Sequence, residues 1–233
     1  MTNDLTENPT ERLTAEELPI FPATPPPVFA DRARTVDLIR PTLTALADVV
    51  QVTDDQLDDP TPCDGFTVEQ LQNHVLGWLQ FFADALADPD GHGARIDTET
   101  RHLATGDNPA EIVTAATDRI VDAVQAGVAD RLVVMAQARM TGDCVLAMAL
   151  GEYLVHGWDL ASAPVRRWPD ATDRVDGEAA TAALAFLEST VAPECRGPDS
   201  GFFGYEVPVP DGAGLFTRLL CFTGRDPHWA PSS

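Results

Sequence analysis

The segment CVLAMALGEYLVHGWDLA, residues Cys144–Ala161, determines how the rest of the chain is interpreted. Its residues are apolar or small, except for Glu152, Tyr153, His156 and Asp159. In a helix of 3.6 residues per turn, positions four and seven after Glu152 lie on the same face as that residue. The sequence therefore predicts a core helix that carries two carboxylates and an imidazole along one side.

Apolar residues at helical spacing predict further helices on both sides of this segment. A capping box at Thr67 and Gln70, and Asn108 followed by Pro109, mark two helix starts. Pro41 either kinks the first helix or marks its first turn. The apolar run RLVVMAQ, residues 131–137, predicts a strand or an extra helical turn. The predicted helices span residues 30–50, 67–86, 108–127, 143–162 and 177–191, with a short helical patch at 215–222.

These elements predict an all-α protein: a four-helix bundle with an additional helix and a Gly/Pro-rich C-terminal segment. Residues 1–28 are acidic and then Pro-rich, which favours a disordered arm. Residues 29–165 are expected to form the bundle. Residues 166–233 are expected to pack on it as a C-terminal helix and cover segment.

Composition excludes several functional classes. The chain has 233 residues and a net charge of −22, so nucleic-acid and anionic-membrane partners are not expected. All 15 basic residues are Arg, which excludes Schiff-base chemistry and a Walker-type phosphate loop. The sequence shows neither a signal peptide nor a membrane span, so we expect a cytoplasmic protein, monomeric or homodimeric. Its four cysteines form no CxxC pair and are expected to be free thiols.

Glu152 and His156 can be explained in two ways. They can hydrogen bond to each other across one helical turn, or they can bind a divalent cation together. His74, on the apolar face of the helix over residues 67–86, would supply a third ligand, or would be a core histidine. Two imidazoles and one carboxylate match a catalytic zinc site with an open position, although nickel, iron or manganese would also accept these donors.

Other polar residues also have two interpretations each. Asp159 either accepts a hydrogen bond from a ligand imidazole, in the second shell of the metal, or reaches solvent near the helix end. Cys63 precedes a helix start, where the helix dipole favours a thiolate, or it is a structural thiol. His92, His102 and His228 lie in polar loops or turns and are expected to be exposed.

Three segments, PTPCDGFTVEQLQNHVLGW, GEYLVHGWDLA and GRDPHW, resemble the DinB-like metal-binding superfamily. The most similar branch is the actinobacterial one related to mycothiol-dependent maleylpyruvate isomerase, and the resemblance extends over residues 31–229. It implies a four-helix bundle with a metal held by His74, Glu152 and His156. Phe66 stands where many relatives carry Trp, a conservative departure.

The resemblance also implies a thiol cofactor, mycothiol or a similar compound, acting on a small electrophile. The resulting hypothesis is a metal-dependent thiol S-transferase or isomerase. The alternatives are a non-catalytic metal- or small-ligand-binding bundle, and an interaction protein that uses its acidic surface and N-terminal arm. The acidic composition disfavours a diacid substrate unless an Arg pair assists, and no motif selects among Arg95, Arg101 and Arg139.

Overall fold

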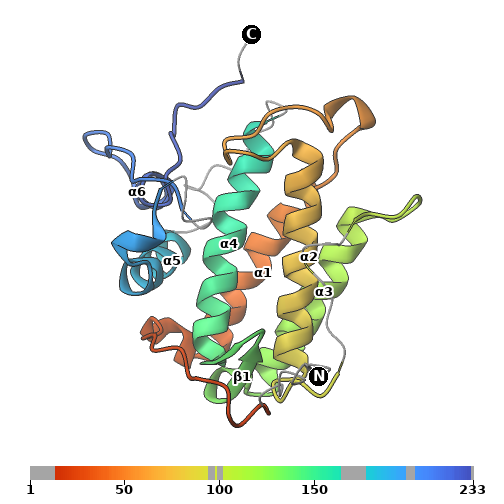
Figure 1. Cartoon of the computed structure of the whole chain (residues 1–233), viewed down its shortest axis with the longest axis vertical. Helices are drawn as coiled ribbons and strands as arrows, with labels where there is room; N and C mark the ends of the chain where they lie inside the picture. The colour runs from red at the N-terminus through yellow and green to blue at the C-terminus, as the bar shows by residue number, and fades with distance from the viewer. Residues whose placement is uncertain (1–13, 94–97, 99–101, 164–176, 198–202, 232–233) are drawn as a thin grey trace, which may run out of the picture.

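The computed structural model describes residues 14–93, 98, 102–163, 177–197 and 203–231 (Figure 1). Within these ranges the regular structure is mostly helical, with one small antiparallel sheet. The helices are α1 (Arg32–Val49), α2 (Val68–Ala87), α3 (Pro109–Gln125), α4 (Gly142–Ser162), α5 (Gly177–Thr190) and α6 (Leu215–Phe222), and the strands are β1 (Leu132–Met135) and β2 (Ala138–Thr141). Single 3-10 turns lie at Pro27–Ala30, Asp54–Gln56, Val128–Asp130 and Pro193–Cys195.

Helices α1 to α4 form the bundle. Both α1 and α2 pack against α3 and against α4, so that the four helices enclose one apolar core. Helix α5 covers the outer side of α4, and α6 packs on α5 (Figure 1). The prediction of an all-α bundle with an additional helix is confirmed.

The helix starts follow from local capping. The side chains of Thr67 and Gln70 each accept a hydrogen bond from the other's backbone N–H, which completes the predicted capping box at the start of α2. The side chain of Asn108 caps α3. Asp31 caps α1, and this helix continues through Pro41, so the interpretation of Pro41 as a first-turn residue is wrong. The cap at Asp31 fixes the start because it satisfies two free backbone N–H groups there.

The run at residues 131–137 contains a strand. β1 pairs with β2 in a hairpin at one end of the bundle, with Leu132 opposite Thr141. Residues 16–21 lie along the outer edge of β2: Phe21 N–H donates to the carbonyl of Arg139, and the Arg139 guanidinium donates to two carbonyls of this segment. The described part of the predicted 1–28 arm is therefore attached rather than free, because the edge of β2 offers unpaired backbone groups. Residues 1–13 lie outside the described part of the chain.

The two ends of the bundle differ in character. The hairpin closes the end at which α4 begins and α2 finishes, so the second half of α4 lies beside the first half of α2 at the other end (Figure 1).

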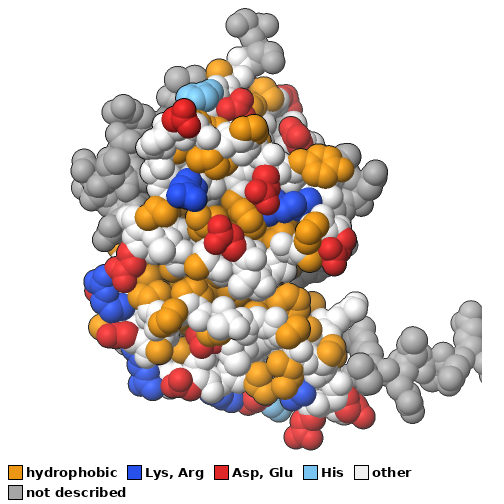
Figure 2. Space-filling model, turned by 90° about the vertical axis from the view of Figure 1, so that its left-hand side faces the viewer, with side chains coloured by type: hydrophobic (Ala, Val, Ile, Leu, Met, Phe, Trp, Pro, Cys, Tyr) orange, Lys and Arg blue, Asp and Glu red, His pale blue; other side chains and the backbone are white. Residues whose placement is uncertain are grey.

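On the side where α5 and α6 lie, acidic, basic and apolar side chains are interspersed (Figure 2). None of the described helices combines the length and apolar character needed to span a membrane.

Gly142, the first residue of α4, lies in a close helix–turn contact. A Cβ atom there would lie 2.7 Å from the carbonyl carbon of Val128 and closer still to its oxygen. We expect Gly142→Ala to lower the free energy of unfolding by about 2 kcal/mol, because backbone must move to admit the methyl group. Thermal and urea unfolding would measure this.

Gly151 in the same helix is the matched control. A Cβ atom there would meet only side chains at 3.6 Å or more, so Gly151→Ala should be neutral or stabilising. Equal destabilisation by both substitutions would contradict the assignment of the contact at Gly142.

Candidate metal centre

Three polar donors from two helices converge inside the bundle. His74 projects from α2, and Glu152 and His156 project from successive turns of α4. The Oε1 atom of Glu152 lies 3.2 Å from Nε2 of His74 and 3.5 Å from Nε2 of His156. One potential ligand atom from each residue lies within 4.8 Å of the other two. The structure thus brings together the three residues that the sequence singled out.

Strong electrostatic coupling links these groups. Burial acts to raise the pKa of Glu152, but the charge on His156 and the hydrogen bond from His74 outweigh it and lower that pKa to about 2. Burial acts in the opposite sense on His156, yet Glu152 and Asp159 raise the pKa of its imidazole to about 10. The cluster therefore holds a carboxylate that attracts positive charge, either a proton on His156 or a cation.

The geometry of the cluster fits a small divalent ion. Zinc–nitrogen bonds of about 2.0–2.1 Å place neighbouring ligands of a tetrahedral ion about 3.4 Å apart. The 3.2 and 3.5 Å separations from the Glu152 oxygen agree with that spacing. The side chains of His74 and Glu152 are 29% and 26% exposed, so the cluster remains accessible to a small molecule. An open, three-donor arrangement of this kind is typical of catalytic rather than structural zinc sites.

Asp159 orients His156. Its Oδ2 atom lies 2.9 Å from Nδ1 of His156, so the other ring nitrogen, Nε2, faces Glu152. Asp159 is fully buried, so the interpretation in which its carboxylate reaches solvent near the helix end is wrong. The carboxylate can stay buried because two charged neighbours, His156 and Arg225, satisfy its oxygens.

Arg225 is the residue of this network that the sequence did not single out. It follows α6, and its guanidinium donates to Asp159, to the Thr223 carbonyl and to the Cys63 sulfur. Burial disfavours its charge, but Asp159 more than compensates and raises the pKa of Arg225. Its only signal in the sequence was its place within GRDPHW, since no periodic pattern relates it to Asp159.

Cys63 belongs to a second group of donors, with His156 and Asp159, in which one ligand atom from each lies within 4.8 Å of the others. This group shares His156 with the first. The guanidinium of Arg225 contacts both Cys63 and Asp159, so a positive charge already lies against two of its three donors. Like-charge repulsion therefore disfavours a cation there, and the group of His74, Glu152 and His156 is the better candidate.

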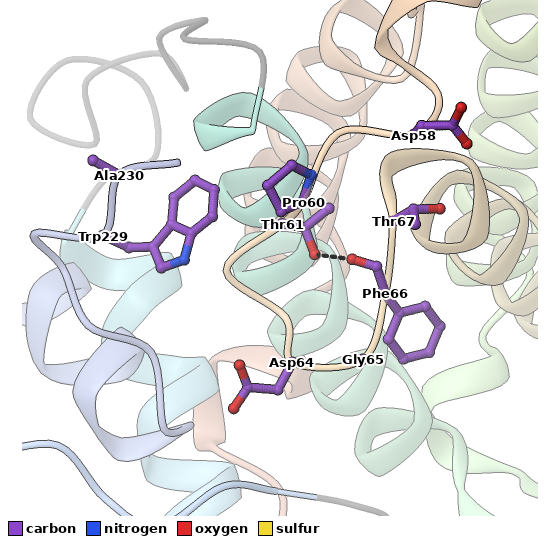
Figure 3. Close-up of a pocket in the computed structure, with 9 residues that line it drawn as sticks. All are labelled: Asp58, Pro60, Thr61, Asp64, Gly65, Phe66, Thr67, Trp229 and Ala230. Atoms are coloured by element: carbon purple, nitrogen blue, oxygen red, sulfur yellow. Dashed lines mark hydrogen bonds between the residues drawn. The ribbon is translucent and has the colours of Figure 1, made fainter. Parts of the chain in front are cut away.

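Aromatic rings line one side of the cluster. The ring of Phe66 lies edge-on to that of His74, with centroids 5.3 Å apart, and Trp78 lies 6.4 Å from the same ring. Phe66 also lines a pocket of about 440 Å³ between the loop before α2 and the C-terminal segment (Figure 3). Trp229 faces Pro60 and Thr61 across this pocket, which is lined by Asp58, Pro60, Thr61, Asp64, Gly65, Phe66, Thr67, Trp229 and Ala230.

The remaining candidates lie elsewhere. His92, His102 and His228 are exposed, as predicted. Arg139 holds the N-terminal segment at the hairpin end of the bundle, away from the donor cluster. Arg95 and Arg101 lie outside the described residues.

Residues 39–161 match the family described as the mycothiol maleylpyruvate isomerase N-terminal domain. The chain belongs to this family. The matched region covers more than half of the chain and includes His74, Glu152, His156 and Asp159, but not Arg225 or the Trp229 wall of the pocket.

The chain is also similar to uncharacterized proteins of two Mycobacterium tuberculosis strains, CDC 1551 and H37Rv. Each is 30% identical over 171 residues, which cover 73% of this chain and 86% of the relative. No solved structure matches the chain significantly. The resemblance found in the sequence motifs is confirmed at the level of the family.

The pKa of His156 makes the stability of the metal-free chain depend on pH. Because this pKa is raised from 6.5 to about 10, the protonated ring stabilises the fold fully below about pH 6.5. That contribution is lost as pH rises through about 10. We expect the unfolding free-energy difference between the native sequence and His156→Gln, measured by urea denaturation with a chelator present, to shrink from pH 6.5 to 10.

His92→Gln serves as the control, because it changes a histidine whose side chain is 81% exposed. It should show no comparable trend. A stabilising contribution of His156 that increased with pH would contradict the electrostatic coupling described here.

Proposed function

We propose that this protein is a divalent-metal-dependent enzyme that uses a low-molecular-weight thiol of the mycothiol type. It would either transfer this thiol to a small electrophile or use the thiol to isomerise the electrophile. His74, Glu152 and His156 would hold the cation, with zinc as the first choice, and Asp159 would orient His156. The observation that carries the proposal is the approach of both imidazole Nε2 atoms to a single Glu152 oxygen, at 3.2 and 3.5 Å. Membership of the mycothiol maleylpyruvate isomerase N-terminal domain family supports the choice of thiol.

The chemistry expected at such a centre is thiol activation. A bound divalent cation would lower the pKa of a thiol enough to give a nucleophile at neutral pH. The surrounding residues of the chain have the complementary task of orientation and water exclusion. Phe66 and Trp78 cover the His74 side of the cluster with aromatic rings, and Asp159 keeps the proton of His156 on Nδ1.

The pocket lined by Phe66 and Trp229 is the candidate position for the part of the thiol that does not react. Two of its lining residues, Asp58 and Asp64, are acidic, and none is basic. It would therefore favour hydroxyl- or amino-bearing groups over anionic ones. The same charge distribution supports a neutral electrophile rather than a diacid, which agrees with the net charge of −22.

Metal content provides the first test. We expect one divalent ion per purified chain, measured by elemental analysis after expression in medium supplemented with zinc and nickel. Glu152→Gln and His74→Ala should each lose this ion, because two remaining donors bind weakly. His92→Ala, at an exposed site, should retain it. A chain that remains metal-free under these conditions would refute the proposal.

Thiol binding separates an enzyme from a bundle that only binds a metal. Calorimetric titration with mycothiol should show binding to the metal-loaded chain, and a panel of neutral electrophiles should be consumed with the thiol. Trp229→Ala should weaken thiol binding up to about tenfold through loss of an aromatic wall. Tyr205→Ala, at a ring that is 71% exposed, is the control. Metal without thiol affinity would favour the non-catalytic alternative.

A further inference from the structure

Arg225 joins three segments of the chain that are distant in sequence. Its Nη1 donates to the Thr223 carbonyl at 2.8 Å in its own turn, and its Nη2 lies 3.0 Å from Oδ2 of Asp159 in α4. The same nitrogen lies 3.2 Å from the sulfur of Cys63, in the loop before α2. Arg225 is 8% exposed and Asp159 is fully buried. Water therefore contributes little to the solvation of either charge.

Stability alone does not account for such a pair. Desolvation of two buried charges offsets most of their attraction, and well-packed apolar residues often serve the fold equally well. What the pair supplies is a fixed geometry. Oδ2 of Asp159 contacts both Nη2 of Arg225 and Nδ1 of His156, so two partners hold it in position.

The arrangement also distinguishes the two donor groups that share His156. Arg225 contacts two donors of the group formed by Cys63, His156 and Asp159. In the other group, no hydrogen bond joins Arg225 to His74, Glu152 or His156 among the contacts of the described residues. A guanidinium at this place neutralises Asp159 and opposes a cation beside Cys63. Its charge also acts on Glu152, but through space and more weakly than the charge of His156 does.

We propose that Arg225 is a positioning residue for the candidate metal centre: it fixes Asp159 and, through it, directs Nε2 of His156 towards Glu152 and His74. It also favours cation binding by His74, Glu152 and His156, because its guanidinium occupies the donor atoms of Cys63 and Asp159. This inference rests on the proposed metal site. Arg225 lies outside the region matched by the family, so the C-terminal segment completes a centre whose donors all lie within that region.

A double-mutant cycle on zinc affinity tests this role. The variants are Arg225→Met, Asp159→Asn and their combination, each measured in competition with a chromophoric chelator. We expect each single substitution to weaken zinc binding about 10–100-fold, as is usual when a ligand histidine loses its supporting partner. The double variant should bind about as weakly as Asp159→Asn alone, because both changes act through one carboxylate.

Two further variants separate positioning from a general effect on the fold. Arg218→Met changes an exposed arginine of α6 and should bind zinc as the native sequence does. Arg225→Lys keeps the charge beside Asp159 and should recover part of the affinity. If Arg225→Met does not fold, two other comparisons test the proposal: Arg225→Lys with the native sequence, and the double variant with Asp159→Asn. The double variant is expected to fold because it leaves neither Arg225 nor Asp159 as an unpaired buried charge.

The absorption spectrum of the cobalt-substituted protein shows which donor atoms bind the metal. The cobalt-loaded native chain should show no sulfur-to-cobalt charge-transfer band, because Arg225 occupies the contact with Cys63. Such a band in the native chain would overturn the proposal, as would unchanged zinc affinity in folded Arg225→Met or losses that multiply in the double variant. These three outcomes would refute only the role of Arg225. A native chain that binds no zinc would refute the proposed function as well.

Discussion

A carboxylate placed between two imidazoles in the interior of a helical bundle is the constraint on which the rest of this structure depends. Glu152 has two neighbouring histidines within 3.5 Å of one oxygen, and their positive charge offsets the cost of partly burying its carboxylate. That requirement places Glu152 of α4 beside His74 of α2. It also explains why α4 carries a row of ionisable residues within an otherwise apolar sequence.

The fold was largely predictable because its signals are local. A capping box, apolar periodicity and a Pro at a helix start are each recognised within a few residues, and α2 and α3 begin where these signals place them. Pro41 was ambiguous because a proline is compatible with both a first turn and a kinked interior. The attachment of residues 16–21 to β2 could not be predicted, since it depends on an edge strand more than a hundred residues away.

The candidate site likewise has residues that local sequence patterns predict and residues that only the tertiary structure reveals. Glu152, His156 and Asp159 share one helix face, so helical spacing alone groups them, and His74 was found on the matching face of α2. Whether Asp159 was buried could not be derived from spacing, because its burial depends on Arg225, which lies 66 residues later. The contribution of Arg225 is a tertiary contact with no periodicity, and motif resemblance was the only available pointer to its segment.

The segment along β2 has a further consequence for the behaviour of the protein in solution. A two-stranded hairpin normally leaves a row of amide and carbonyl groups on which another chain can add a strand. Here the N–H of Phe21 donates to the carbonyl of Arg139, and the N–H of Arg139 donates to the carbonyl of Pro19. The guanidinium of Arg139 donates to two more carbonyls of the same segment. Residues 16–21 thus cover the edge of β2 and disfavour edge-to-edge aggregation there. This edge lies at the end of the bundle opposite the candidate metal centre.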